Sequence, residues 1–234
     1  MQSAFPGFPA EGLEFFAALQ RHNRREWFQP RKATFDEKLK QPMRELVGAV
    51  NLAMKRFAPD YATDPDKAIY RIYRDTRFAH DKTPYKDHIA AFFPRRGDKE
   101  SAGYYFAVSH KEVAIGGGIY MPSPEMLLAI RRQVAERHEE FRKIMGGRAA
   151  VRLFGPMQGE RLTRVPKGYA SDHPAADLLR FKQFLFYVTL APELATTAAL
   201  YTEVVKHFRA VTPLVEFLNT PLRAKRSVSV KGLS

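Results

Sequence analysis

The spacing of apolar residues changes twice along this chain, and this change limits the folds that the chain can adopt. Residues 31–57 place apolar side chains three or four positions apart, which is typical of amphipathic helices. Residues 67–117 instead contain short runs rich in Ile, Tyr and Phe between turn residues, which is typical of β-strands. Helical spacing returns after Ser123 and over residues 193–219. This order predicts an α+β fold: a mostly antiparallel sheet with N-terminal and C-terminal helices packed on it.

Individual strands and helix ends can be placed from the same pattern. We expect strands in the runs KAIYRIYR, DHIAAFFP, GYYFAVSH, KEVAIGG and FLFYVTL. Alternation places Tyr104, Phe106 and Val108 on one face of their strand. Ser123 followed by proline predicts the start of a helix. Pro213 is expected to kink or divide the last helix.

The chain reads as one continuous domain. Its 234 residues contain neither a fixed-period repeat nor a Gly/Ser-rich linker, so a single domain over residues 1–219 is the simplest organisation. Residues 220–234 contain four Lys or Arg, no acid and little apolar content. We therefore predict a basic, flexible C-terminal tail there.

Composition excludes several classes of protein. A hydrophobic content of 45% and an aromatic content of 12% exclude a disordered chain. The absence of cysteine excludes disulfides, thiolate zinc sites and cysteine nucleophiles. No apolar run approaches the roughly 18–20 residues that span a bilayer, and the first residues lack the basic start of a secretory signal. These features predict a cytoplasmic protein without a membrane partner.

The chain is strongly basic. It carries 38 Lys and Arg against 25 Asp and Glu, which gives a formal charge of +13. Residues 141–180 alone contain eight basic and three acidic side chains. Because Lys and Arg neutralise phosphates, nucleic-acid binding by the basic faces at 141–170 and by the tail is one hypothesis. The alternative is that these side chains form solvated surfaces.

The densest polar segment, residues 67–88, has more cations than acids. Its cations are Lys67, Arg71, Arg74, Arg77, Lys82 and Lys86, and its acids are Asp75, Asp81 and Asp87. Arginine can bind a carboxylate or phosphate through two parallel N–H groups, and adjacent aromatic rings fix its plane. We therefore predict that the segment binds a small anionic ligand, either as part of a binding protein or as part of an enzyme.

Each side chain of this segment has an expected role. The expected ligand-binding residues are Arg71, Arg74, Arg77, Lys82, Tyr85 and Lys86. Asp75 and Asp81 would orient these cations or act as a catalytic base. The alternative is a structural or partner-binding protein, in which the two carboxylates pair with arginines to brace the loop. The excess of cations favours a ligand site, because a buried unpaired arginine would be costly.

Two further segments are candidates for the opposite wall of the site. Gly117 and Gly118 follow a predicted strand, and their backbone amides could hold an oxyanion. The alternative for these glycines is a bulge or tight bend. Lys167 and His173 lie on a turn-rich loop, and loops commonly carry binding residues.

Motifs for metals, nucleotides and serine catalysis are missing from the sequence. None of the seven histidines shows a recognised metal spacing, so no metal site is expected. His80 and His88 flank the polar segment and are candidate general acids or bases. The patterns GxxxxGK[ST], GxGxxG and GxSxG are absent. The cofactor, the oligomeric state and enzymatic activity remain open at this point.

Four strings in order resemble a known family. NRREWF, RIYRDTRFAHDKTPYK, GGGIYMP and PKGYASDHPAADLLRFK are similar to the pattern of the bacterial and fungal family called domain of unknown function 2461. The resemblance covers residues 8–218. It implies a single α+β domain and supplies no established activity, cofactor or catalytic residues. Its strings include the Arg, Lys and Asp side chains of the polar segment.

Overall fold

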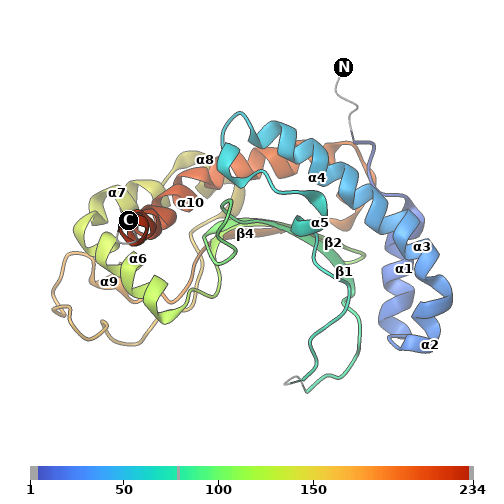
Figure 1. Ribbon diagram of the computed structural model, residues 1–234, viewed down its shortest axis with the longest axis horizontal. Coiled ribbons are helices and arrows are strands. Elements are labelled where there is room, and N and C mark those ends of the chain that lie inside the picture. The colour runs from blue at the N-terminus through green and yellow to red at the C-terminus, as the bar shows by residue number, and fades with distance from the viewer. Residues whose placement is uncertain (1–4, 78–79, 232–234) are drawn as a thin grey trace. The chain divides into compact units, whose positions relative to one another are not determined.

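The computed structural model describes residues 5–77 and 80–231, with side chains up to Pro221. Its elements form an α+β fold around a four-stranded antiparallel sheet, as the sequence pattern predicts (Figure 1). The residues gather into two compact units, each built from three stretches of chain. Unit 1 comprises the residues up to Phe93, Tyr105–Ile115 and Thr189–Lys206, and unit 2 comprises Pro94–Tyr104, Gly116–Val188 and the residues from His207 on.

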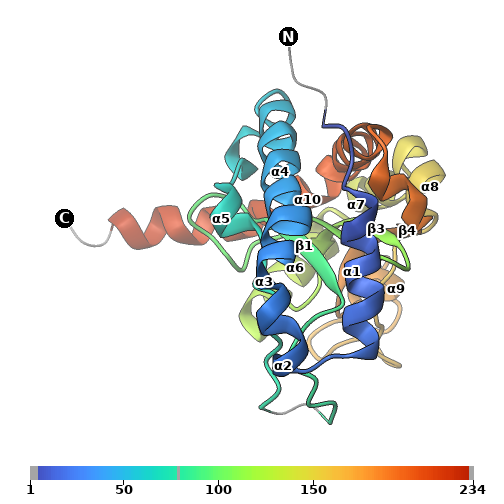
Figure 2. The ribbon, with the colours of Figure 1, turned by 90° about the vertical axis from the view of Figure 1, so that its right-hand side faces the viewer.

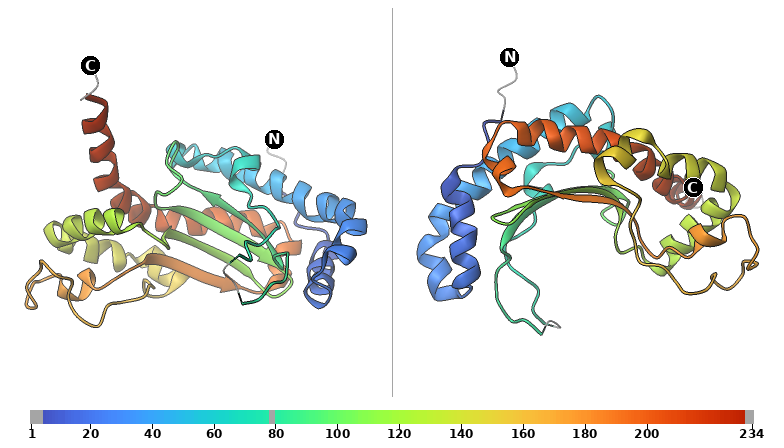
Figure 3. Two further views of the ribbon diagram at one scale, coloured as in Figure 1. Left: turned by 60° about the horizontal axis from the view of Figure 1, so that its bottom comes forward. Right: turned by 180° about the vertical axis from the view of Figure 1, so that it is seen from behind.

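The sheet follows the chain order. It contains β1 (His88–Phe93), β2 (Gly103–Ser109), β3 (Val113–Ile119) and β4 (Phe184–Leu190), hydrogen-bonded in that sequence (Figure 3). Tyr104, Phe106 and Val108 of β2 are all fully buried, as expected for alternate residues that share a face. Four of the five predicted strands are therefore confirmed.

The first part of unit 1 is helical. Its elements are α1 (Ala10–Arg21), α2 (Arg25–Phe28), η1 (Gln29–Arg31), α3 (Lys32–Phe35), η2 (Asp36–Lys40), α4 (Gln41–Met54), η3 (Pro59–Tyr61) and α5 (Pro65–Ala68). The Phe15 ring of α1 packs against Phe28 and Phe35, with centroid separations of 6.1 and 6.0 Å. These aromatic contacts hold α1 antiparallel to the α3–α4 stretch (Figure 2).

Unit 2 supplies the later helices. They are α6 (Pro124–Glu136), α7 (His138–Met145), α8 (Arg148–Phe154), α9 (Ala176–Leu179) and the larger part of α10 (Ala199–Lys231), while η4 (Pro192–Thr196) lies in unit 1. The Ser123 hydroxyl accepts the N–H of Met126 at 3.3 Å, which confirms the expected helix start. Within unit 2, the Phe208 ring of α10 lies 5.0 Å from the Tyr104 ring of β2, so α10 packs on the sheet.

One predicted strand is wrong. The run KAIYRIYR begins in α5, because Asp64 caps this helix by accepting the N–H of Asp66 and Pro65 fits the first helical position. Beyond α5 the run forms only two isolated antiparallel bridges, Ile69 with Ala91 and Tyr73 with Tyr85. The run therefore forms no continuous strand, and the chain bends at Ile72, which is buried between the exposed Arg71 and Tyr73.

Two expectations concern the C-terminal helix. Pro213 lies inside α10 and does not divide it. The helix continues to Lys231, so the backbone of residues 220–231 is helical where the sequence predicts a tail. The flexibility of that segment stays a prediction, and residues 232–234 lie outside the described residues.

Candidate functional site

The polar segment forms an extension of β1 in unit 1. Residues 69–77 and 80–87, here called the arm, leave α5 and return to the start of β1 (Figure 3). The Tyr70 N–H donates to the Ala90 carbonyl at 2.9 Å, and the Lys86 N–H donates to the Ile72 carbonyl at 2.8 Å. The Arg74 N–H donates to the carbonyl of Pro84, whose missing N–H leaves no donor unpaired there. The two sides of the arm therefore run antiparallel.

Asn23 and Phe28 hold the second stretch of the arm, residues 80–87, in place through Tyr85. The Asn23 side chain donates to the Tyr85 carbonyl at 2.9 Å and accepts the Tyr85 N–H at 3.0 Å. The Tyr85 ring stacks on Phe28 at 4.2 Å and lies 5.4 Å from the Tyr73 ring. Tyr85 is only 1% exposed, so its ring anchors the arm in the core, and its predicted ligand-binding role stays a prediction.

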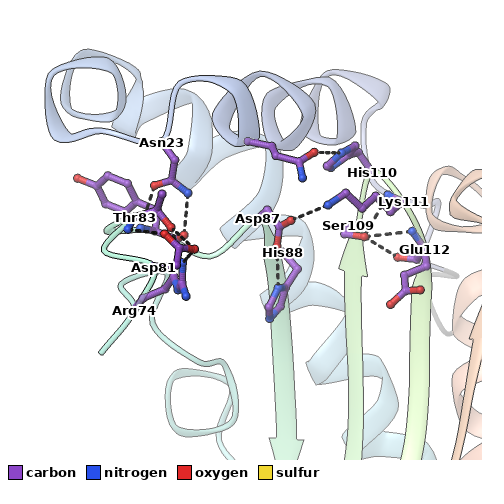
Figure 4. A network of polar contacts seen from close by, with 12 residues as sticks. Asn23, Arg74, Asp81, Thr83, Asp87, His88, Ser109, His110, Lys111 and Glu112 are labelled. Carbon is purple, nitrogen blue, oxygen red and sulfur yellow. Dashed lines mark hydrogen bonds and ion pairs between the residues drawn. The ribbon is translucent and has the colours of Figure 1, made fainter. Parts of the chain in front are cut away.

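Arg74 is held inside the arm. Its guanidinium donates to the Asp81 carboxylate and to the Thr83 hydroxyl (Figure 4). Asp81 also accepts the Thr83 N–H at 2.9 Å. The Thr83 N–H, the Arg74 guanidinium and the Thr83 hydroxyl together lower the pKa of Asp81 to about 2. Arg74 and Asp81 therefore brace the loop, which is the alternative that the sequence left open for this pair.

Arg77 and Lys82 also have partners within the arm. The Arg77 guanidinium binds Asp75 through two hydrogen bonds, of 3.0 and 2.7 Å. These bonds and the Arg77 N–H lower the pKa of Asp75 to about 2. Lys82 Nζ donates to the Thr76 carbonyl at 2.9 Å. A carboxylate with so low a pKa is a weak base, which does not favour a catalytic role for Asp75 or Asp81, and that role stays a prediction.

Arg71 and Lys86 differ from the other cations of the arm. Within the described residues, neither side chain makes a hydrogen bond or an ion pair. Lys86 is half-buried, and its Nζ lies 5.0 Å from the centre of the Tyr70 ring. Burial lowers the pKa of Lys86, and the positive charge of Arg71 lowers it further. Within the described residues Lys67 and Lys82 bind no carboxylate either, so these four cations carry the charge excess of the segment, and the charge of Arg71 also acts on Asp75.

A second polar network lies at the start of β1 and the β2–β3 turn of unit 1. Asp87 accepts from Lys111 Nζ at 3.1 Å and contacts His88 Nδ1 at 3.3 Å (Figure 4). Burial raises the pKa of Asp87, but hydrogen bonds to Lys111 and His88 outweigh it, so the net direction is downward. Asp87 therefore orients the ring of His88, a predicted acid–base candidate. The Asp87–Lys111 pair was missed, because 24 residues separate the two and no spacing signals it.

Four predicted residues of the opposite wall belong to unit 2, whereas the arm belongs to unit 1. A Cβ on Gly117 would lie 2.6 Å from Val211 Cγ1, and one on Gly118 would lie 2.0 Å from the Phe184 carbonyl oxygen. Packing within unit 2 therefore explains both glycines. His173 Nδ1 accepts the Ala175 N–H at 3.0 Å, and Lys167 is exposed. A ligand-binding role for these four residues stays a prediction.

The described residues contain neither a candidate membrane span nor a candidate metal cluster. Residues 5–77 and 80–231 contain no helix that is both long and apolar enough to cross a bilayer. The same part of the chain contains no group of three or more His, Asp or Glu side chains that could hold a metal ion.

The fold and the arm define an α+β protein with a four-stranded antiparallel sheet and a cation-bearing extension of its first strand. The chain belongs to the family described as "Conserved hypothetical protein (DUF2461)", whose model matches residues 11–217. The match confirms the family resemblance of the four strings. No curated protein and no solved structure matches the chain.

Proposed function

We propose that this protein binds a small anionic ligand, bearing a phosphate or a carboxylate, between Arg71 and Lys86 of the arm. The proposal is narrower than the sequence-based hypothesis, because Arg74 and Arg77 are paired with Asp81 and Asp75. Lys82 is left out as well, since the Thr76 carbonyl accepts from it.

The single observation that supports the proposal is the environment of Lys86. A half-buried ammonium group loses hydration, and this loss is usually offset by a carboxylate. Among the described residues no acid pairs with Lys86, and the charge that acts on it is the positive charge of Arg71. Two cations arranged in this way repel one another until an anion lies between them. An anionic ligand would supply the missing counter-charge.

Titration with inorganic phosphate at low ionic strength, followed by calorimetry, tests the proposal. Lys86→Met and Arg71→Gln should each weaken phosphate binding by about tenfold or more, because each removes a charge-assisted hydrogen bond. Lys40→Met is the matched control, since it removes the same charge from an exposed position of unit 1. Equal phosphate affinity in all three variants and the parent protein would refute the proposal.

The nucleic-acid hypothesis for residues 141–170 stays a prediction. Two of the basic side chains there have internal roles, since Arg142 binds Asp177 at 2.6 Å and Arg161 lies 4.1 Å from the centre of the Phe181 ring. Binding by the remaining cations should fall steeply as salt is added, because phosphate contacts release counterions. A gel-shift series across salt concentrations tests this, and a flat response would refute it.

A further inference from the structure

The ring of Tyr70 is the aromatic surface beside Lys86, and Tyr70 precedes Arg71 in the chain. Tyr70 is 46% exposed, and the hydrogen bond from its N–H to Ala90 fixes its backbone against β1. Lys86 Nζ lies over the ring, 5.0 Å from its centre. No other aromatic ring of the described residues packs against it. Tyr70 thus has a hydrogen-bonded backbone and a side chain that is partly open to solvent.

Tyr73 shows why Tyr70 is distinct. Tyr73 is comparably exposed, at 44%, but its ring lies 5.4 Å from the ring of Tyr85. The Tyr73–Tyr85 contact contributes to anchoring the arm, as does the Phe28–Tyr85 stack. Tyr70 has no such structural partner, so its packing gives no reason for an exposed aromatic ring at this position.

The side chains of Tyr70, Arg71 and Lys86 together suit a ligand that has an aromatic part and an anionic part. A bare anion would use Arg71 and Lys86 and would leave the Tyr70 ring unused. Any flat aromatic group can stack on a tyrosine ring. Proteins bind nucleobases in this way, whichever base is present. A lysine on the tyrosine ring adds a cation–π contribution and also approaches an attached phosphate. A nucleobase joined to a phosphate meets both requirements.

We infer that the anionic ligand of the arm is a nucleoside phosphate, with its base stacked on Tyr70 and its phosphate held between Arg71 and Lys86. This inference rests on the proposed anion-binding function and names the ligand class of the same site. The same chemistry is offered by a free mononucleotide and by a single-stranded nucleic acid.

Binding of three small probes separates the inference from the proposed function. Adenosine 5′-monophosphate should bind at least about fivefold more tightly than ribose 5-phosphate, because only the former can stack. Inorganic phosphate reports on the cations alone. Tyr70→Ala should reduce the affinity for adenosine 5′-monophosphate to that for ribose 5-phosphate, whereas Tyr70→Phe should retain it. Tyr120→Ala, at a 62% exposed tyrosine of unit 2, is the matched control.

The outcomes are distinguishable. If adenosine 5′-monophosphate and ribose 5-phosphate bind equally and Tyr70→Ala changes neither, the inference fails while anion binding stands. If Lys86→Met leaves binding of all three probes unchanged, the proposed function fails as well. Thermal unfolding of each variant shows whether it remains folded, and the comparison of adenosine 5′-monophosphate with ribose 5-phosphate on the parent protein keeps the test valid if Tyr70→Ala is unstable.

A short single-stranded oligonucleotide identifies the source of the nucleoside phosphate. A free nucleotide as the ligand predicts that a pentanucleotide gains little affinity over the mononucleotide. A strand as the ligand predicts a gain of several-fold and a steeper dependence on salt, because further phosphates contact the protein. In both cases Tyr70→Ala must weaken binding. Failure of both probes to bind overturns the inference.

Discussion

All three asparagines of the sequence bind the backbone of one distant residue through both amide atoms. Asn23 holds Tyr85, Asn51 holds the N–H and carbonyl of Thr63 at 2.9 and 2.6 Å, and Asn219 holds those of Ala102 at 3.0 and 2.9 Å. An asparagine amide carries one acceptor and a donor group, as a peptide unit does. Each asparagine side chain therefore binds the backbone N–H and carbonyl of its partner residue as a neighbouring β-strand would.

Glycine positions differ sharply in what a methyl group would meet. Gly118 has a φ of +124°, and a Cβ there would lie 2.0 Å from the Phe184 carbonyl oxygen. Gly118→Ala should therefore lower the free energy of unfolding by about 2–4 kcal/mol. Gly48 lies in α4 with nothing within 4 Å of a Cβ, so Gly48→Ala should raise it by about 0.5–1 kcal/mol. Urea denaturation measures both, and destabilisation by Gly48→Ala would contradict this packing.

His110 should make stability depend on pH. Its Nε2 lies 3.0 Å from Gln20 Oε1, and within the described residues its buried Nδ1 has no partner. Burial lowers the pKa of His110, Lys111 and Arg21 lower it further, and Asp87 opposes them. The unfolded chain, with an ordinary pKa of about 6.5, then binds the proton first as pH falls. The free energy of unfolding should consequently decrease as pH drops through about 6.5.

The His110→Gln variant isolates this contribution from that of the other histidines. The loss of stability between pH 7.5 and pH 5 should be smaller in His110→Gln than in the parent protein. An NMR titration of the His110 ring should give a midpoint below about 6.5. A midpoint above this value, or an unchanged pH dependence in the variant, would show that His110 is not held neutral by its surroundings.

The sequence could predict the charge excess of the arm but not its distribution among side chains. Counting charges showed six cations against three acids over residues 67–88. The structure pairs Arg74 with Asp81 and Arg77 with Asp75. Within the described residues this leaves four cations without a carboxylate, namely Lys67, Arg71, Lys82 and Lys86, of which Lys82 donates to the Thr76 carbonyl. Which arginine meets which carboxylate depends on the bends of the arm, and residue types alone do not determine those bends. The role of Asn23 was missed for the same reason, because its partner lies 62 residues away.

At the scale of elements, the hydrogen bonds of Asn23 attach the arm to the loop between α1 and α2. Asn23→Ala removes the acceptor of the Tyr85 N–H and the donor to its carbonyl, both partly buried. The free energy of unfolding should fall by about 1–3 kcal/mol, because both backbone groups lose their partner. Hydrogen exchange should show faster exchange at the Tyr85 amide in the variant. Unchanged exchange would mean that stacking on Phe28 alone holds the arm.

The periodicity of apolar residues was sufficient to predict most helices and strands. The strands β1 to β4 combine β-branched and aromatic residues with turn residues at their ends, so pattern and structure agree. KAIYRIYR has an equally strong strand pattern but forms no strand, because α5, which begins at Pro65 after the Asp64 cap, extends over its first two residues. A local cap thus overrides the strand preference of the following Ile and Tyr residues, which keep only isolated bridges to the β1 side.

At the scale of the whole molecule, the two units share their secondary structure elements. Strands β2, β3 and β4 and helix α10 each begin in one unit and end in the other. Unfolding of one unit alone would have to break four elements part-way along their length. Partly broken strands and helices lose hydrogen bonds without gaining the chain entropy of complete unfolding. We therefore expect the chain to unfold in one cooperative transition.

Trp27 makes this expectation testable, because it is the single tryptophan of the chain and lies in unit 1. Asn219→Ala removes two buried hydrogen bonds in unit 2 and should lower the free energy of unfolding by about 2–4 kcal/mol. In urea, the Trp27 fluorescence transition should move to lower concentration together with the far-ultraviolet circular dichroism transition. Lys143→Ala, an exposed change in α7, should move neither. A Trp27 transition that stays in place while the dichroism becomes biphasic would show that the units unfold separately, because damage in unit 2 would then fail to reach unit 1.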